Sequence, residues 1–186
     1  MKIKEIILSA LNLIGRGDIA AALEKGEELT TEASHTADTL LYCVNSVLDE
    51  LARYYFPLSH TETVNLIGGK AAFADFTYRP VKILGITSNG KKTAYKIYPA
   101  YLTADAVQIE AEYEYSPDKK GLDDDCDYSG LQAGARLIAT GAVSEFCLLN
   151  GEVSGAEYWE SEYRREIDRA RARLRGNIKI PPRRWV

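Results

Sequence analysis

Val107-Gln-Ile-Glu-Ala-Glu-Tyr-Glu-Tyr115 alternates apolar and polar residues over its whole length. Successive side chains of a β-strand point to opposite faces, so the apolar residues share one face. That face would carry Val107, Ile109, Ala111, Tyr113 and Tyr115, and the other Gln108, Glu110, Glu112 and Glu114. The pattern predicts a half-buried antiparallel strand with an acidic face toward solvent.

Four segments with the same period of two precede this strand. They are Glu62–Ile67, Ala71–Phe76, Val81–Thr87 and Thr93–Ile97. Gly68-Gly69 separates the first two segments and favours a hairpin there. Ser88-Asn89-Gly90-Lys91 separates the last two and indicates a type I′ turn. We therefore expect five or six strands in residues 60–116, forming a compact antiparallel β module.

Helical periodicity flanks the β region on both sides. The expected helices are Lys2–Ile14, Ile19–Lys25, Ala37–Tyr55, Leu131–Leu149 and Gly155–Leu174, with Thr30, Thr31 or Ser34 able to start the third. The predicted fold class is α+β: a helical bundle of three N-terminal and two long C-terminal helices, with an inserted small antiparallel β module and an extended C-terminal arm. The expected parts are the bundle (1–58 and 129–176), the β module (59–117), an acidic loop (118–128) and the arm (177–186).

The predicted helix Leu131–Leu149 is rich in small residues. Gly134 and Gly141 each cost about 1 kcal/mol of helix propensity relative to alanine. A helix that keeps such residues is expected to need them for packing, so we predict that a neighbouring helix approaches closely.

Composition places the chain among ordinary soluble globular proteins, with 46% hydrophobic and 27% charged residues. We expect no membrane span, because no apolar run approaches the roughly 18–20 residues that a span needs. We also expect no signal peptide at the N-terminus. Cys43, Cys126 and Cys147 are an odd number at wide spacing, which favours a reduced cytosolic environment over a disulfide framework.

Candidate chemical sites are few. Asp123-Asp-Asp-Cys-Asp127 could attract a cation, but it lacks the Gly and Glu of a calcium loop, so a solvated loop that caps a helix is the better interpretation. His35 and His60 are the only histidines, and nothing marks a serine or cysteine as activated. We therefore expect no catalytic residue, no metal site and no cofactor.

The C-terminal segment differs from the rest in charge. Residues 164–186 hold nine bases and two acids, a formal charge of +7, so residues 1–163 carry −11 within a chain total of −4. Pro181 and Pro182 exclude helix at its end and favour an extended, polyproline-like arm. Trp185 has no core of its own on such an arm, which favours docking into a groove of another molecule. A nucleic-acid patch and a disordered terminus stay open as alternatives.

The order of these elements resembles the head–tail connector, or adaptor, proteins of tailed bacteriophages. The resemblance is carried by Lys2–Ile14, Thr39–Tyr55 with Phe56-Pro57, the strands within 62–115, Ala133–Leu149, Tyr158–Arg175 and the tail Ile178–Val186. A Leu-Leu-Asn-Gly break between the last two helices, with Tyr158, Trp159 and Tyr163 opening the second, is similar to the family.

The resemblance implies a structural virion protein without catalytic activity. Such proteins form rings, typically of twelve copies, beneath the portal protein, and receive the next tail or stopper component at their other end. Genomic DNA passes through the ring without specific binding. The implied location is the neck of the virion, after assembly in the host cytoplasm, with no membrane partner.

The resemblance also implies roles for particular residues. The portal-docking arm would consist of Ile178, Ile180, Pro181, Pro182, Arg183, Arg184 and Trp185. Bundle packing and subunit contacts would use Phe146, Trp159, Tyr163, Ile167 and Leu174. The acids Glu110, Glu112 and Glu114, if they face the channel, would repel passing DNA.

Two alternatives remain. One is another ring, stopper or neck component with the same docking logic. The other is a DNA-binding packaging or regulatory protein that uses the arginines of Arg164–Arg175 as its recognition surface. Steep loss of DNA affinity with salt would favour the second.

Overall fold

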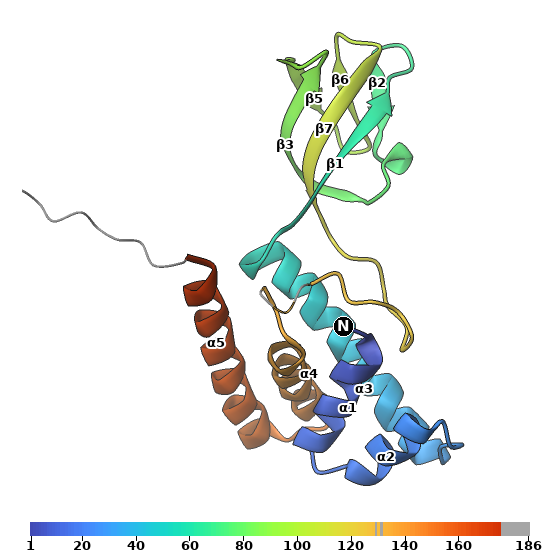
Figure 1. Ribbon diagram of the computed structural model, residues 1–186, viewed down its shortest axis with the longest axis vertical. Helices are drawn as coiled ribbons and strands as arrows, with labels where there is room; N and C mark the ends of the chain where they lie inside the picture. The colour runs from blue at the N-terminus through green and yellow to red at the C-terminus, as the bar shows by residue number, and fades with distance from the viewer. Residues whose placement is uncertain (129, 131, 176–186) are drawn as a thin grey trace, which may run out of the picture. The chain divides into compact units, whose positions relative to one another are not determined.

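The computed structural model describes residues 1–128, 130 and 132–175. The chain divides into two compact units, each built around its own secondary structure (Figure 1). The helical unit comprises Met1–Val47 and Lys120–Val186, and the β unit comprises Leu48–Lys119.

The helices are α1 (Ile3–Leu13), α2 (Gly17–Lys25), α3 (Thr31–Glu50), α4 (Ala135–Leu149) and α5 (Val153–Arg175). A π-helical turn, Leu51–Tyr55, continues α3, and the amide of Phe56 donates to the carbonyl of Leu51. Thr30 caps α3, because its Oγ1 accepts a hydrogen bond from the amide of Ala33 at 3.2 Å. The prediction that Thr30 can start this helix is confirmed.

Helix α4 is the centre of the helical unit. Its residues from Leu137 to Ser144 are all buried, so it is buried all round instead of along one stripe. At Gly141, a Cβ atom would lie 2.9 Å from Cε2 of Tyr163 on α5 and 3.1 Å from Cγ1 of Val47 on α3. The predicted close approach is confirmed at Gly141, whereas Gly134 lies just before the helix and meets no such neighbour.

The acidic loop holds the start of α1. The amides of Ile3 and Lys4, which have no partner within the helix, donate to the carbonyls of Asp124 and Leu122 at 3.0 and 2.9 Å. Lys2 pairs with Asp125, and Asp124 accepts from the amide of Gly121. The loop therefore caps a helix, although the capped helix is α1 and not the one that follows.

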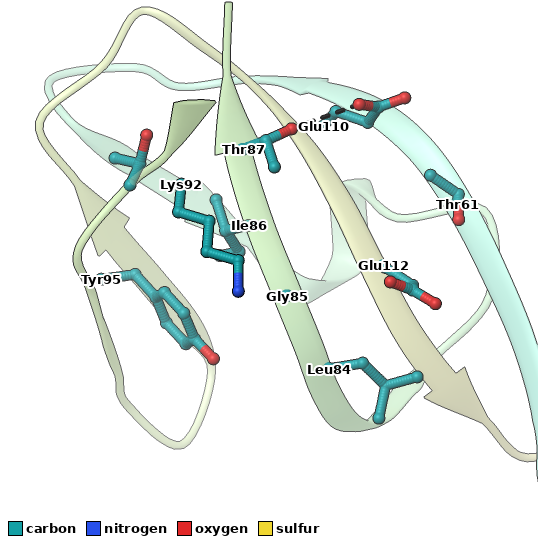
Figure 2. A pocket seen from close by; sticks show the side chains of 10 residues that line it. Thr61, Leu84, Gly85, Ile86, Thr87, Lys92, Tyr95, Glu110 and Glu112 are labelled. Atoms are coloured by element: carbon teal, nitrogen blue, oxygen red, sulfur yellow. Dashed lines mark hydrogen bonds between the residues drawn. The ribbon is translucent and has the colours of Figure 1, made fainter. Parts of the chain in front are cut away.

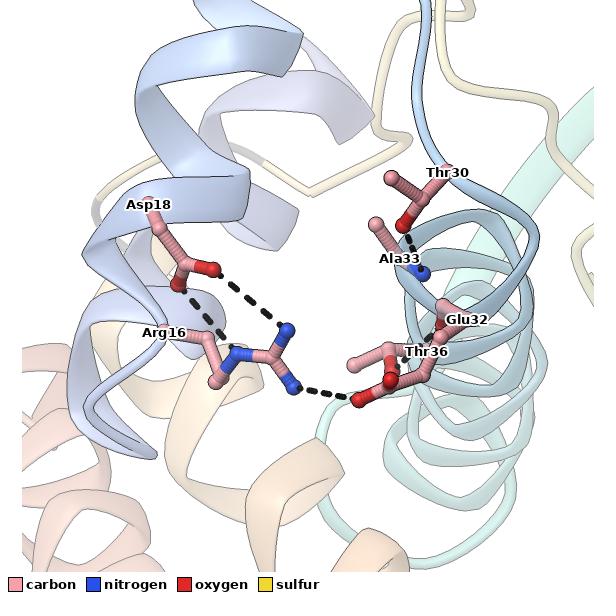
Figure 3. Close-up of polar contacts among 6 residues, drawn as sticks. All are labelled: Arg16, Asp18, Thr30, Glu32, Ala33 and Thr36. Atoms are coloured by element: carbon pink, nitrogen blue, oxygen red, sulfur yellow. Dashed lines mark hydrogen bonds and ion pairs between the residues drawn. The ribbon is translucent and has the colours of Figure 1, made fainter.

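A second polar contact joins the helices at their connections. The guanidinium of Arg16 donates to Asp18 at 3.2 Å and to Glu32 at 3.5 Å, which links the start of α2 to the first turn of α3 (Figure 3). The hydrogen bond from Arg16 keeps the pKa of Asp18 below its usual range. The pairs are solvent-exposed, so they orient these turns more than they stabilise them.

The β unit consists of two antiparallel sheets (Figure 1). The four-stranded sheet has the order β1-β7-β3-β4, and the three-stranded sheet has the order β2-β6-β5. Their bounds are β1 (Leu58–Asn65), β2 (Lys70–Ala72), β3 (Pro80–Ser88), β4 (Lys91–Lys92), β5 (Tyr95–Ile97), β6 (Tyr101–Ala104) and β7 (Gln108–Tyr115). Both sheets contribute to one core, which contains Val64, Leu66, Ala71, Phe76, Ile86, Leu102, Ala104, Ile109, Ala111 and Tyr113.

The alternation in β7 is confirmed within the strand. Ile109, Ala111 and Tyr113 are buried, while Gln108, Glu110 and Glu112 are exposed. At its ends the pattern does not hold, since Val107 precedes the strand and is 83% exposed. The Ser88–Lys91 turn is also confirmed, because Asn89 and Gly90 both have the positive φ that a type I′ turn needs.

The predicted fold class is wrong. The β part is not a small module with helices arranged three and two around it: it has seven strands in two sheets and a hydrophobic core of its own. The five helices pack in a separate unit, with α4 at its centre. Local periodicity located the elements along the chain, but the packing partners of each element depend on contacts distant in sequence.

Three segment predictions are also wrong. The expected strand Ala71–Phe76 ends at Ala72 and continues as a 3₁₀ turn, Phe73–Asp75. The expected hairpin around Gly68-Gly69 is reduced to a single bridge between Ile67 and Lys70, because β1 pairs with β7 and β2 pairs with β6. The helix expected from Leu131 begins at Ala135.

Candidate interaction surfaces

The outer face of the four-stranded sheet carries a hollow of about 440 Å³, lined by charged, hydroxyl and aliphatic side chains (Figure 2). Glu110 and Glu112 reach it from β7 and Thr61 from β1, while Lys92 and Tyr95 line its other side. A break in register between Ile83 and Gly85 leaves Leu84 exposed at its edge. Gly85 stands opposite Glu112 and has no side chain, which keeps the middle of the hollow open.

The three acids predicted to face a channel differ in their partners. Glu114 pairs with Lys82 at 3.5 Å and is half-buried. Glu110 is exposed and accepts a hydrogen bond from Oγ1 of Thr87 at 3.2 Å. Glu112 is exposed and has no ion-pair partner within the described part of the chain. The acidic face therefore presents two carboxylates, Glu110 and Glu112, that no lysine or arginine of the described residues neutralises directly.

The turn between α4 and α5 has several exposed large apolar side chains around it, which we call the hairpin tip. It consists of Leu148, Leu149, Val153 and Tyr158, each between 59% and 60% exposed. The turn is tight, with Gly151 at φ 76° and its amide donating to the carbonyl of Leu148. Large apolar side chains exposed around one turn make that turn a candidate protein–protein interface.

An apolar groove of about 710 Å³ lies on the β unit between segments 73–81 and 97–100. Its walls are aromatic and aliphatic, formed by Phe73, Phe76, Pro80, Val81, Ile97, Tyr98, Pro99 and Ala100. Val81 and Ile97 are each 55% exposed, and Tyr98 is 40% exposed. Arg79, also exposed, is the charged residue of the lining.

Two further apolar residues stand at turns of the β unit. Ile67 is 86% exposed and Val107 is 83% exposed. The amide of Leu66 donates to the carbonyl of Val107 at 2.8 Å, so these two turns lie side by side. They form a second, smaller apolar surface, and neither residue lines the groove.

The residues predicted for bundle packing and subunit contact divide into three groups by burial. Tyr163 and Ile167 are buried inside the helical unit, and Phe146 and Trp159 are half-buried. Leu174 is 50% exposed.

The sequence analysis did not identify the hairpin tip as a surface. Its residues fall outside the apolar stripes of their helices. Large apolar residues outside a stripe are the sequence signal that could have revealed it.

Three of the six arginines of α5 pair with glutamates of the same helix. Arg164 donates to Glu160 at 2.7 Å, and Arg169 donates to Glu166 at 2.7 Å. Arg165 donates to Glu162 at 2.5 Å. Phosphate contacts by these side chains would have to compete with the existing pairs.

The proposed docking residues lie outside the described part of the chain. Ile178, Ile180, Pro181, Pro182, Arg183, Arg184 and Trp185 all fall in 176–186. The docking arm therefore stays a prediction from sequence.

The pKa of each of the three cysteine thiols is raised, which lowers its reactivity. Burial raises the pKa of Cys43 to about 12, with a smaller contribution from the charge of Glu145. Burial also raises the pKa of Cys126 and Cys147. A nucleophilic cysteine needs the opposite shift. Across residues 1–128, 130 and 132–175, no group of three or more His, Cys, Asp or Glu side chains is placed to hold a metal ion.

Comparison with models of known protein families finds no match, and comparison with curated proteins finds none either. No helix in the described residues is long and apolar enough to cross a membrane.

Proposed function

We propose that this protein is a head–tail adaptor of a tailed bacteriophage. In this proposal it forms a ring under the portal protein, docks to the portal through residues 177–186, and joins the capsid to the tail around the DNA channel. It acts as a structural component of the neck and carries out no reaction.

The observation that carries the proposal is the exposure of the hairpin tip. Leu148 and Leu149 belong to the Leu-Leu-Asn-Gly break that supports the resemblance, and Tyr158 opens the helix after it. These side chains are more than half exposed in the single chain. Burying them against another protein would be favourable by the hydrophobic effect, as expected for a subunit of an assembly.

The charge distribution supports the same proposal. The basic segment 164–186 carries +7 against −11 in the rest of the chain. The arm itself, residues 177–186, holds three bases and no acid, a formal charge of +3, which suits acidic groups or helix C-termini of a portal ring. Glu110 and Glu112, if turned toward the channel, would repel the phosphates of passing DNA and ease its movement. A ring structure with this sheet face turned away from the channel would refute that placement.

The DNA-binding alternative is less well supported. Three arginines of α5 already pair with glutamates three or four residues earlier. A phosphate contact by any of these three would exchange one ion pair for another, so its net gain in binding free energy would be small.

A binding experiment separates the two functions. The full chain is mixed with purified portal rings of the same virus, and separately with duplex DNA, over a series of salt concentrations. The adaptor proposal predicts a complex with the portal and little DNA affinity at physiological salt. DNA binding that falls steeply with salt, without portal binding, would instead favour the alternative.

A further inference from the structure

We propose that the hairpin tip of one copy docks into the apolar groove of the β unit of a second copy. The inference rests on the proposed ring, and it names the contact that would hold neighbouring subunits together. The two surfaces lie on different units of the chain and share no residue.

Both surfaces consist mainly of apolar residues, and one projects from the chain while the other is a hollow. The tip is the end of a helical hairpin, a convex feature that presents two leucines, a valine and a tyrosine. The groove is a hollow of about 710 Å³ with walls of phenylalanine, tyrosine, proline and aliphatic side chains. Aromatic and aliphatic residues at the centre with an arginine at the margin form the usual composition of a protein interface.

Their charges are complementary as well. Arg79 is exposed in the groove lining and has no ion-pair partner among the residues described. Glu157 is exposed beside Tyr158 and lies one turn after Val153, on the same side of α5. Glu152, also exposed, flanks the tip at the turn. An arginine at the groove and glutamates at the tip would pair on docking and set the orientation of the two surfaces.

A contact between two different patches is the kind of contact from which rings are built. It repeats from copy to copy and leaves no patch unused once the ring closes. A contact of one patch with itself would stop at a dimer. The charge difference between groove and tip favours the first arrangement, because tip against tip would bring glutamates together.

Sedimentation velocity of the purified full chain, without portal, tests the contact. Arg79→Glu and Glu157→Arg are expected to weaken self-association, each by roughly threefold to tenfold in Kd. Leu149→Ser is expected to weaken it by at least about tenfold, because it removes an apolar anchor. Ile67→Ser serves as the matched control: it changes an exposed apolar residue outside both surfaces and should leave self-association unchanged.

Mixing the two charge variants gives the decisive result. In an equimolar mixture, the groove of the Arg79→Glu variant is acidic and the tip of the Glu157→Arg variant is basic. These two surfaces can therefore pair, with the charges exchanged relative to the unmodified chain. The native pair of Arg79 and Glu157 forms at the next contact. Self-association should therefore recover toward that of the unmodified chain. A mixture no better than either variant alone overturns the proposal, and so does an unmodified chain that stays monomeric at about 1 mM.

The mixing experiment and the portal-binding experiment test the subunit contact and the adaptor function separately. Recovery in the mixture without any portal binding would support the contact and contradict the adaptor proposal. Portal binding without recovery would contradict the contact and leave the adaptor proposal standing. Circular dichroism of each variant checks that the fold is retained, which is expected because every changed side chain is exposed.

Discussion

Glu62 shows how one side chain fastens a loop to the β unit. It accepts hydrogen bonds from the amide and Oγ1 of Thr77, at 2.9 and 2.7 Å, and from the hydroxyl of Tyr113. Burial alone would raise the pKa of Glu62, but the hydrogen bonds from Tyr113 and Thr77 outweigh it and lower the pKa. The charged carboxylate is thus the form that the folded state stabilises.

Glu62→Gln should make the protein less stable at neutral pH by about 1 kcal/mol, because charge-assisted hydrogen bonds are lost. A carboxyl with a lowered folded pKa stabilises fully above its unfolded pKa, so the contribution is complete above about pH 5. It is lost as the pH falls through the lowered pKa. Urea denaturation followed by tyrosine circular dichroism should show a difference at pH 7 that vanishes in acid.

The matched control for this prediction is Glu110→Gln. Glu110 lies on the same four-stranded sheet and is exposed, so its change should stay within about 0.5 kcal/mol. An effect of Glu62→Gln that is equal at neutral and acid pH would contradict the role given to the charge.

The sequence could predict one half of this network. Alternation in β7 correctly places Tyr113 on the buried face. The hydroxyl group of Tyr113 donates a hydrogen bond to Glu62, which is 51 residues away on β1. Nothing in the sequence around either residue indicates that pairing. Buried polar partners of this kind follow from the register of strands, which sequence alone left open.

At the scale of elements, α4 depends on the absence of a side chain at Gly141. Gly141→Ala would improve helix propensity by about 1 kcal/mol. The new methyl group would press on the ring of Tyr163 and on Val47, and overpacking of this kind costs roughly 1–3 kcal/mol. We therefore expect a net loss of stability, measured as a lower urea midpoint.

Gly17→Ala is the matched control at this scale. A Cβ atom at Gly17 would meet only the Asn12 side chain, at an ordinary 3.6 Å. Its effect should be close to zero or slightly stabilising. A stabilised Gly141→Ala protein would show that α4 can move away from α3 and α5, contrary to the packing described here.

The elements also show where sequence patterns fail. The glycines at 68 and 69 correctly mark a turn, with φ of 61° and 75°. The glycines determine where the chain reverses direction, but they do not determine which strands pair. The strands on either side of the turn, β1 and β2, belong to different sheets. The hairpin tip was missed for a related reason, because apolar periodicity finds the residues that pack inside and overlooks apolar residues outside the stripe.

For the whole molecule, the proposed function assigns portal docking to the predicted arm, residues 177–186. Trp185→Ala should weaken portal binding by about 2 kcal/mol or more if Trp185 is an interface anchor, which is roughly 30-fold in Kd. Self-association of the chain should be unchanged, because Trp185 belongs to neither surface of the proposed subunit contact. Surface plasmon resonance on immobilised portal rings measures the first effect.

Tyr42→Ala provides the control for this change. Tyr42 is 64% exposed on α3 and belongs to neither proposed surface, so the substitution removes an exposed aromatic ring without touching the arm. Portal affinity of that variant should match the unmodified chain. Equal binding by Trp185→Ala and the unmodified chain would remove Trp185 from the docking account.

The central claim is that this chain is a ring-forming adaptor docked through residues 177–186. Cryo-electron microscopy of the full chain mixed with portal rings of the same virus tests it most directly. The account predicts a closed ring against the portal, with residues 177–186 seated in portal grooves. A chain found only along DNA, or bound to the portal without those residues in contact, would contradict it.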